Sequence, residues 1–188
     1  MGTLENLVSQ ARQYCKVGRF AEAAQLIDQA INLAPKDAVL YHEKCLILGM
    51  MRRYQDSLGA IDEAIRLNPK SADFHCEKGL ALSNLVRNTE ALAAFKEAIR
   101  LNPHDADFHS GKGDILVELK RYQDALRAYN EAVRLNYRDA GLHFKCCYML
   151  GALERFEEAR TECGIAIKLD PSNAKYRQAM RMIEDRFL

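Results

Sequence analysis

Apolar residues recur along the chain in short blocks, and the pattern of each block returns 34 residues later. Between residues 72 and 105, Phe74, Leu82 and Leu85 fall on one helical stripe, and the segment VRNT interrupts it. The segment EALAAFKEAIRLN then forms a second stripe, whose apolar face is made by Ala91, Ala94, Phe95 and Ala98. The pattern therefore predicts two helices in each block of 34 residues.

The same residue types occupy the same place in five successive blocks. One column is alanine throughout: Ala30, Ala64, Ala98, Ala132 and Ala166. A second column is proline with one exception: Pro35, Pro69, Pro103, Tyr137 and Pro171. A third is arginine: Arg19, Arg53, Arg87, Arg121 and Arg155. Such agreement without an insertion predicts a repeat architecture.

Local signals predict where the helices of each block begin and end. The first helix follows a residue whose side chain can cap a helix N-terminus: Asp37, Ser71, Asp105, Asp139 and Asn173. The proline column follows the second helix, since proline cannot continue a helix. We expect each arginine of the column to end a first helix, where a cation is stabilised by the helix dipole.

This pattern resembles the tetratricopeptide repeat family over nearly the whole chain. The resemblance rests on the alanine and proline columns and on small residues in the first helices: Ala11, Cys45, Gly79, Gly113 and Cys147. It implies an all-α fold, a right-handed α-solenoid of about five helix-turn-helix repeats. It also implies a single domain over residues 1–188, with repeats at 4–37, 38–71, 72–105, 106–139 and 140–173 and a capping helix at 174–188.

The composition is typical of a water-soluble protein. The 188 residues include 48% hydrophobic and 28% charged residues, with a net charge of +1. No apolar stretch reaches the ~18 residues that a membrane span needs, and the chain starts without a secretory apolar segment. The six cysteines contain no CxxC pair, which favours reduced thiols and a cytoplasmic location. We expect no membrane partner.

Asp73, His75 and Cys76 lie within four residues and could make a metal site or a nucleophile with its base. His75 falls in a packing column with Tyr41, His109 and His143. Equivalent residues on stacked helices lie ~8–10 Å apart, too far to share one metal ion. One alternative stays open, because His143, Cys146 and Cys147 cluster in one helix and could supply two ligands, where a structural site needs four.

Enzyme signatures are absent from the sequence. It contains no GxSxG, glycine-rich phosphate loop, HExxH or catalytic cysteine motif. We therefore predict a protein that is not an enzyme, with no catalytic residues, no metal and no cofactor.

The resemblance implies that first helices line a concave face that binds an extended peptide or a helix. Carried over residue by residue, the partner-binding face comprises Val39, Glu43, Leu46, Asp73, Glu77, Leu80, Asp107, Asp114, Glu118, Phe144 and Tyr148. Six of these are carboxylates and none is basic, which favours a basic and apolar partner. The alternative is that they are solvated helix residues, among which Asp73 and Asp107 serve the helix N-termini.

One ligand of the family is not expected. Some members hold the acidic C-terminal tail of heat-shock chaperones with a clamp of lysine, asparagine and arginine. The corresponding places here hold Val8, Arg12, Glu43, Asp73 and Glu77, whose acids would repel a carboxylate tail.

Two further hypotheses remain. The arginine column could meet phosphates, but no aromatic residues interleave with it, and nucleic acid is not expected as a partner. A homo-oligomeric scaffold is the alternative function, with the capping helix docking into another chain through Met180, Ile183, Phe187 and Leu188.

Overall fold

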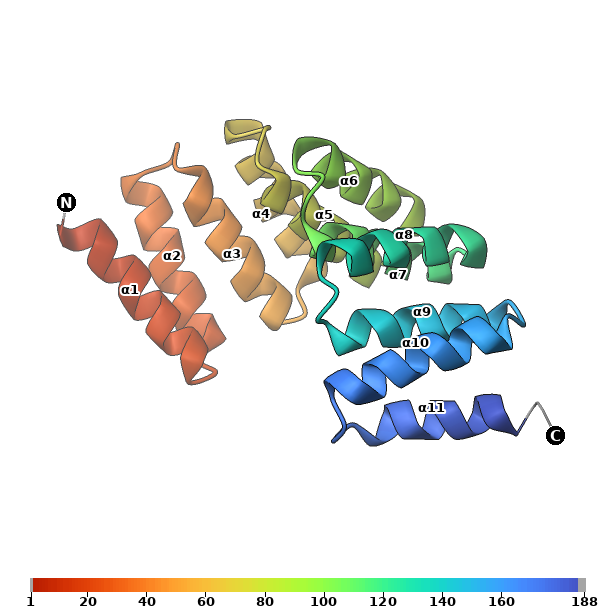
Figure 1. Cartoon of the computed structure of the whole chain (residues 1–188). Coiled ribbons are helices and arrows are strands. Elements are labelled where there is room, and N and C mark those ends of the chain that lie inside the picture. The colour runs from red at the N-terminus through yellow and green to blue at the C-terminus, as the bar shows by residue number, and fades with distance from the viewer. Residues whose placement is uncertain (1, 186–188) are drawn as a thin grey trace. The chain divides into compact units, whose positions relative to one another are not determined.

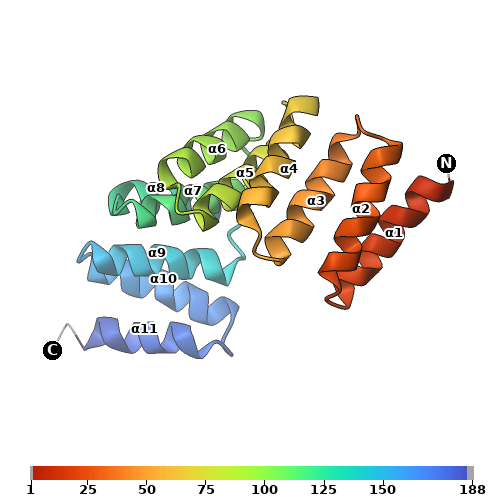
Figure 2. The ribbon, with the colours of Figure 1, turned by 180° about the vertical axis from the view of Figure 1, so that it is seen from behind.

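The computed structural model describes residues 2–185, which form eleven α-helices and no strand (Figures 1 and 2). The helices are α1 Gly2–Lys16, α2 Phe20–Leu33, α3 Ala38–Met50, α4 Tyr54–Leu67, α5 Ala72–Asn84, α6 Asn88–Leu101, α7 Ala106–Glu118, α8 Tyr122–Leu135, α9 Ala140–Ala152, α10 Phe156–Leu169 and α11 Ala174–Glu184. The predicted all-α repeat fold is confirmed. None of the described helices is long and apolar enough to cross a membrane.

The helices fall into two compact units. The first runs from Met1 to Leu101 and holds α1–α6, and the second runs from Asn102 to Leu188 and holds α7–α11. The assignment of residues 1–188 to a single domain stays a prediction.

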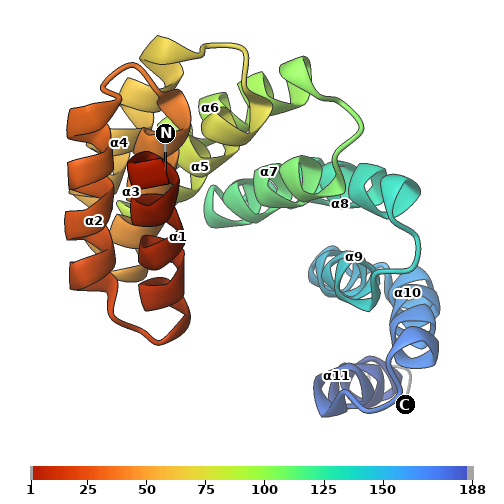
Figure 3. The same cartoon turned by 90° about the vertical axis from the view of Figure 1, so that its left-hand side faces the viewer.

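Within each unit, consecutive helices pack as pairs, α1 with α2, α3 with α4, and so on. First helices of neighbouring pairs also touch, since α3 contacts α5 and α9 contacts the capping helix α11. In Figure 3, α9 and α11 lie on the same side of α10. This arrangement gives each unit a face built from first helices.

A small residue lets the two helices of a pair approach closely. A Cβ placed on Gly79 would lie 2.8 Å from the ring of Phe95, and one on Gly113 would lie 2.4 Å from the ring of Tyr129. The ring of the second helix therefore rests directly on the backbone of the first. The alanine column is buried throughout, as the predicted stripe requires.

The N-cap predictions hold with one difference. All five predicted residues stand at the N-cap of a first helix or of α11. The carboxylates of Asp37, Asp105 and Asp139 and the amide oxygen of Asn173 accept hydrogen bonds from first-turn N–H groups. The Ser71 side chain makes no such bond. Helix α5 therefore begins without a hydrogen bond from a capping side chain.

The arginine column corrects the sequence interpretation. The arginines stand directly before the second helices, at the N-cap position of α2, α4, α8 and α10, whereas the first helices end three residues earlier. A cation is unfavourable at a helix N-terminus. Each guanidinium instead pairs with a carboxylate three residues on: Glu22, Asp56, Glu90, Asp124 and Glu158.

The turn between the helices of each repeat needs a left-handed backbone at one residue. Gly18 fills this place in the first repeat, with φ of 77°. The later repeats use Arg52, Val86, Lys120 and Glu154, with φ between 57° and 60°. Val86 is the strained member, because a β-branched residue rarely adopts this conformation.

Val86→Gly should therefore stabilise the first unit. Val86 is exposed, so little packing is lost, and relief of backbone strain should raise the unfolding free energy by about 0.5–1 kcal/mol. Urea denaturation followed by circular dichroism measures this change. The reverse substitution, Gly18→Val, should lower stability by a similar amount; equal stability of all three proteins would contradict the assigned strain.

Candidate functional site

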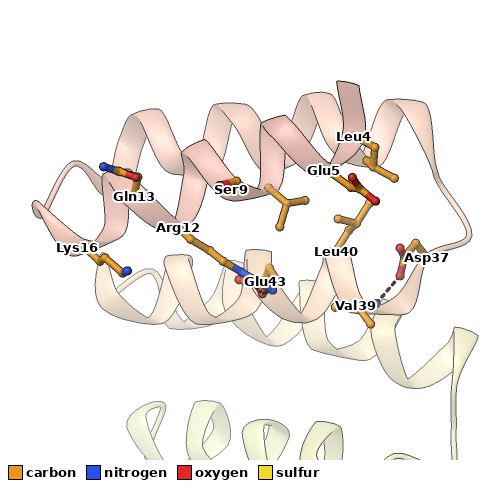
Figure 4. Close-up of a pocket in the computed structure, with 11 residues that line it drawn as sticks. Leu4, Glu5, Ser9, Arg12, Gln13, Lys16, Asp37, Val39, Leu40 and Glu43 are labelled. Atoms are coloured by element: carbon orange, nitrogen blue, oxygen red, sulfur yellow. Dashed lines mark hydrogen bonds and ion pairs between the residues drawn. The ribbon is translucent and has the colours of Figure 1, made fainter. Parts of the chain in front are cut away.

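The first-helix face of the first unit carries a groove between α1 and α3 (Figure 4). Its cavity of about 490 Å³ is lined by Val39 and Glu43 from the predicted set, together with Val8, Arg12 and Lys16 of α1. Val39 is about half exposed, so an apolar side chain is available on this face. The groove therefore combines apolar walls with charges of both signs.

Glu43 already forms an ion pair inside the unit. The Arg12 guanidinium donates to the Glu43 carboxylate, with 3.0 Å between Nε and Oε1. The two residues lie 31 positions apart, on α1 and α3. Glu43 thus contributes little net negative charge to a ligand in this groove.

Asp73 and Glu77 on α5 form the uncompensated acidic part of the same unit. Among the ion pairs of residues 2–185, none involves either carboxylate. Burial, followed by the charge of Asp73, raises the pKa of Glu77. Leu80 is exposed one helical turn further along α5, and α5 contacts α3, which carries Leu46. These residues make a small acidic and apolar surface.

Asp114 of the second unit is held as firmly as Glu43. Lys145 of α9 donates from Nζ to both carboxylate oxygens, at 2.7 and 2.8 Å, and to Ser110 Oγ at 2.9 Å. The Tyr129 hydroxyl donates to Asp114 Oδ1 at 2.7 Å. Burial, followed by this carboxylate, raises the pKa of Tyr129. Asp114 is therefore a structural link between α7, α8 and α9.

Asp107 and Glu118 remain exposed at opposite ends of α7, without an ion pair among the described residues. Phe144 packs against Tyr176 of α11, with ring centroids 4.8 Å apart, and Tyr148 is largely exposed. Phe144, Tyr148 and Met182 line a cavity of about 560 Å³ between α9 and α11. Among residues 2–185, Lys175 is the only charged residue that lines it. Asp107 and Glu118 thus lie on α7, whereas Phe144 and Tyr148 line the cavity between α9 and α11.

The histidine column ties down the turns that precede the first helices. His75, His109 and His143 each place Nε2 within 2.9–3.0 Å of the carbonyl oxygen six residues earlier. The Tyr41 hydroxyl donates to the Pro35 carbonyl in the same way. His143 also places Nδ1 2.7 Å from Glu162 Oε2. The residues of this column therefore hold the preceding turns by hydrogen bonds, in addition to the packing role that the sequence indicated.

The cluster of His143, Cys146 and Cys147 lies on α9. Across residues 2–185, no three His, Cys, Asp or Glu side chains are arranged to hold a metal ion. The Cys146 thiol donates to Asn130 Oδ1 at 3.4 Å, on the side of α9 that faces α8. Cys146 therefore points toward α8, whereas Cys147 lines the cavity between α9 and α11.

The internal ion pairs of Glu43 and Asp114 were missed from sequence, although a signal existed. Both partners, Arg12 and Lys145, lie 31 residues from the carboxylate they neutralise. A separation of one repeat less one helical turn places two side chains on adjacent first helices. The acidic surface is accordingly smaller than the six carboxylates suggested.

Residues 76–140 match the family model described as tetratricopeptide repeat. A search of curated proteins by sequence found no match.

Solved structures resemble the chain at low sequence identity. PilF of Pseudomonas aeruginosa has a TM-score of 0.84 at 16% identity, over 98% of this chain and 86% of its own. MamA of Desulfovibrio magneticus RS-1, solved from residue 41 onward, has a TM-score of 0.82 at 16% identity, over 93% and 98%. YrrB, described as a tetratricopeptide protein with an unusual peptide-binding site, has a TM-score of 0.75 at 19% identity, over 93% and 90%. The tetratricopeptide repeat model therefore matches residues 76–140, and the solved structures show the same fold over most of the chain.

Proposed function

We propose that the protein is a non-enzymatic, cytoplasmic adaptor that binds a basic and apolar peptide or helix of a partner protein on its first-helix faces. The fold supports a protein-binding role, and YrrB, which shares it, is described as having a peptide-binding site. The acidic C-terminal tail of heat-shock chaperones, nucleic acid and membranes are not proposed as partners.

The observation that carries this proposal is the pair of uncompensated carboxylates on α5. Asp73 and Glu77 lie one helical turn apart and have no ion-pair partner among the described residues, and the apolar Leu80 is exposed nearby. A lysine or arginine of a ligand would lower the pKa of Glu77, which burial raises in the free protein. Asp107 and Glu118 offer exposed carboxylates on α7 of the second unit.

The arginine column supports the same choice of partner. All five guanidinium groups are engaged by carboxylates three residues away. A phosphate-bearing ligand would have to compete with these local pairs. The arginine column is therefore a weaker binding surface for an anionic partner than the sequence suggested.

The double variant Asp73→Lys, Glu77→Lys should lose affinity for a basic ligand. The probe is a labelled synthetic peptide that alternates lysine and leucine, with a glutamate–leucine peptide as its negative counterpart. Each exposed pair is worth ~0.2–1 kcal/mol, and reversal turns two attractions into repulsions, so the dissociation constant should rise roughly tenfold or more. Fluorescence anisotropy at two salt concentrations measures the change.

The matched control is Asp56→Lys, Glu63→Lys on α4, which alters the net charge equally on a second helix. We expect it to bind the lysine–leucine peptide nearly as tightly as the wild type. Equal loss in both variants would show general charge attraction and no site on α5. Unchanged binding in the Asp73→Lys, Glu77→Lys variant would overturn the proposed surface.

The alternative function is self-association, which exposed apolar side chains on α9 and α11 favour. Tyr148 and Met182 are largely exposed beside the apolar cavity between α9 and α11. Of the residues predicted for docking, Ile183 is instead buried in its own unit, and Phe187 and Leu188 lie outside the described residues. Sedimentation over a range of protein concentrations tests this alternative, because a monomer at all concentrations would exclude it.

A further inference from the structure

The cavity between α9 and α11 differs in charge from the acidic surface on α5. Its volume of about 560 Å³ lies in the range of small-molecule sites. Phe144 and Tyr148 of α9 and Phe156 of α10 give it aromatic walls. Among the described residues, no carboxylate lines it, and Lys175 of α11 supplies a positive charge. The cavity is therefore mostly apolar and carries a charge of one sign.

The polar residues of this cavity lie together near the start of α11. Lys175 stands in the first turn of the helix, and Gln178 follows one helical turn later on the same face. Met182 and Ile183, which also line the cavity, come near the C-terminal end of α11. Because an α-helix rises about 1.5 Å per residue, Lys175 and Met182 lie about 10 Å apart along the helix axis. The cavity thus changes from polar to apolar over the length of a small molecule.

The Lys175 ammonium is available to a ligand. The residue is exposed, and no ion pair of its side chain occurs among the described residues. Asp139 caps α9 and Asp170 stands in the turn before α11, but neither carboxylate lines the cavity. Both carboxylates accept hydrogen bonds from backbone N–H groups, those of Gly141 and Ser172. The charge of Lys175 therefore stays open to an anion from outside the chain.

This charge pattern distinguishes between possible ligands. A lysine or arginine of a basic peptide would be repelled by Lys175 and by the positive end of the α11 dipole. An anionic group would instead pair with the Lys175 ammonium and accept a hydrogen bond from the Gln178 amide. An aromatic body attached to that group would cover Tyr148 and Met182, which are largely exposed in the free protein.

We propose that the cavity between α9 and α11 binds a small aromatic monocarboxylate. Its carboxylate pairs with Lys175, and its ring lies between Tyr148 of α9 and Met182 of α11. The buried residues Cys147 and Ile183 close the cavity behind the ring. Since the ligand contacts both helices, binding strengthens the attachment of the capping helix α11 to the fifth repeat. The site is independent of the basic peptide proposed for the surface on α5.

The probes are naphthylacetate and naphthylacetamide, which have nearly the same shape and differ in charge. The full chain, isotope-labelled for NMR, is titrated with each probe, and chemical-shift changes give the dissociation constants. The acid should bind the wild type about two- to fivefold more tightly than the amide, because an ion pair with an exposed lysine contributes that much. The shifts should centre on the backbone N–H groups of Tyr148 and Gln178.

Three variants of α11 separate the effect of charge from that of shape. Lys175→Gln should weaken binding of the acid about two- to fivefold and leave binding of the amide unchanged. Arg181→Gln is the matched control, because Arg181 has the same charge on the same helix but does not line the cavity. It should bind both probes as the wild type does. Ala179→Leu should abolish binding of both, since the larger side chain enters the cavity from α11; circular dichroism checks that its helices are intact.

Four outcomes would overturn the proposal. The absence of saturable binding of the acid would exclude the site. Equal binding of acid and amide by the wild type, or equal losses in Lys175→Gln and Arg181→Gln, would exclude the carboxylate pair. Tighter binding of a peptide that ends in a free phenylalanine carboxylate would assign the cavity to the end of a protein chain. Shifts of Tyr148 on dilution of the protein alone would assign it to a second copy of this chain.

Discussion

Phe95→Ala should lower the unfolding free energy of the first unit by about 3–5 kcal/mol, the range for removing a fully buried aromatic side chain. The Phe95 ring is 1% exposed and rests on the backbone of Gly79. No side chain at position 79 can move in to fill the space. Denaturant titration followed by circular dichroism measures the loss.

A second substitution separates this contact from general packing. Gly79→Ala places a Cβ 2.8 Å from the Phe95 ring and should cost about 1–3 kcal/mol through overpacking. In the Phe95→Ala background the same methyl group enters the vacated space and should cost less. Equal costs in both backgrounds would contradict the close approach of α5 and α6 at this point.

An exposed leucine provides the control for the size of the effect. Leu33 is mostly exposed near the end of α2, so Leu33→Ala should change stability by less than about 0.5 kcal/mol. A similar loss at Leu33 and Phe95 would show that the repeat core is not where the structure places it.

The repeat period explains why the fold could be predicted from sequence. Each local signal occurs five times, so a break in one copy, such as Tyr137 in the proline column, does not obscure the pattern. Gly79 belongs to the predicted column of small residues and Phe95 to the predicted apolar face of the second helix, and the structure brings the two together. Local propensity and global packing agree, which is typical of a sequence that specifies one fold.

Side-chain pairing was harder to predict because it depends on which neighbour a long side chain reaches. The bonds of Arg12 to Glu43 and of Lys145 to Asp114 depend on side-chain rotamers, which no column of the repeat records. The arginine column was misplaced for a related reason. The left-handed residue before each arginine shifts the start of the second helix, and Gly18 signals this conformation in only one repeat.

The same limit applies to the partner-binding face. Val39, Leu80 and Tyr148 are exposed and available to a ligand. Glu43 and Asp114 are instead paired with Arg12 and Lys145. These contacts leave fewer unpaired carboxylates on the predicted face than the sequence suggested. Binding experiments should therefore target Asp73 and Glu77 before the paired carboxylates.

His143→Ala should lower the unfolding free energy of the second unit by about 3 kcal/mol. His143 is 1% exposed, and its two ring nitrogens face the Glu162 carboxylate and the Tyr137 carbonyl oxygen. Removal leaves both acceptors without their partner. The value combines two lost hydrogen bonds with the space left by a buried ring, and the Glu162 side chain, which is 26% exposed, regains some water.

The histidine column supplies the matched comparison. His75 makes the corresponding bond to the Pro69 carbonyl but is only half-buried, and no ion pair of its ring occurs among the described residues. His75→Ala should therefore cost less than His143→Ala, about 1 kcal/mol for one hydrogen bond near solvent. Thermal and urea denaturation of both variants measure the difference. Equal losses would show that the contact with Glu162 contributes nothing, and a larger loss at His75 would contradict the burial that ranks the two positions.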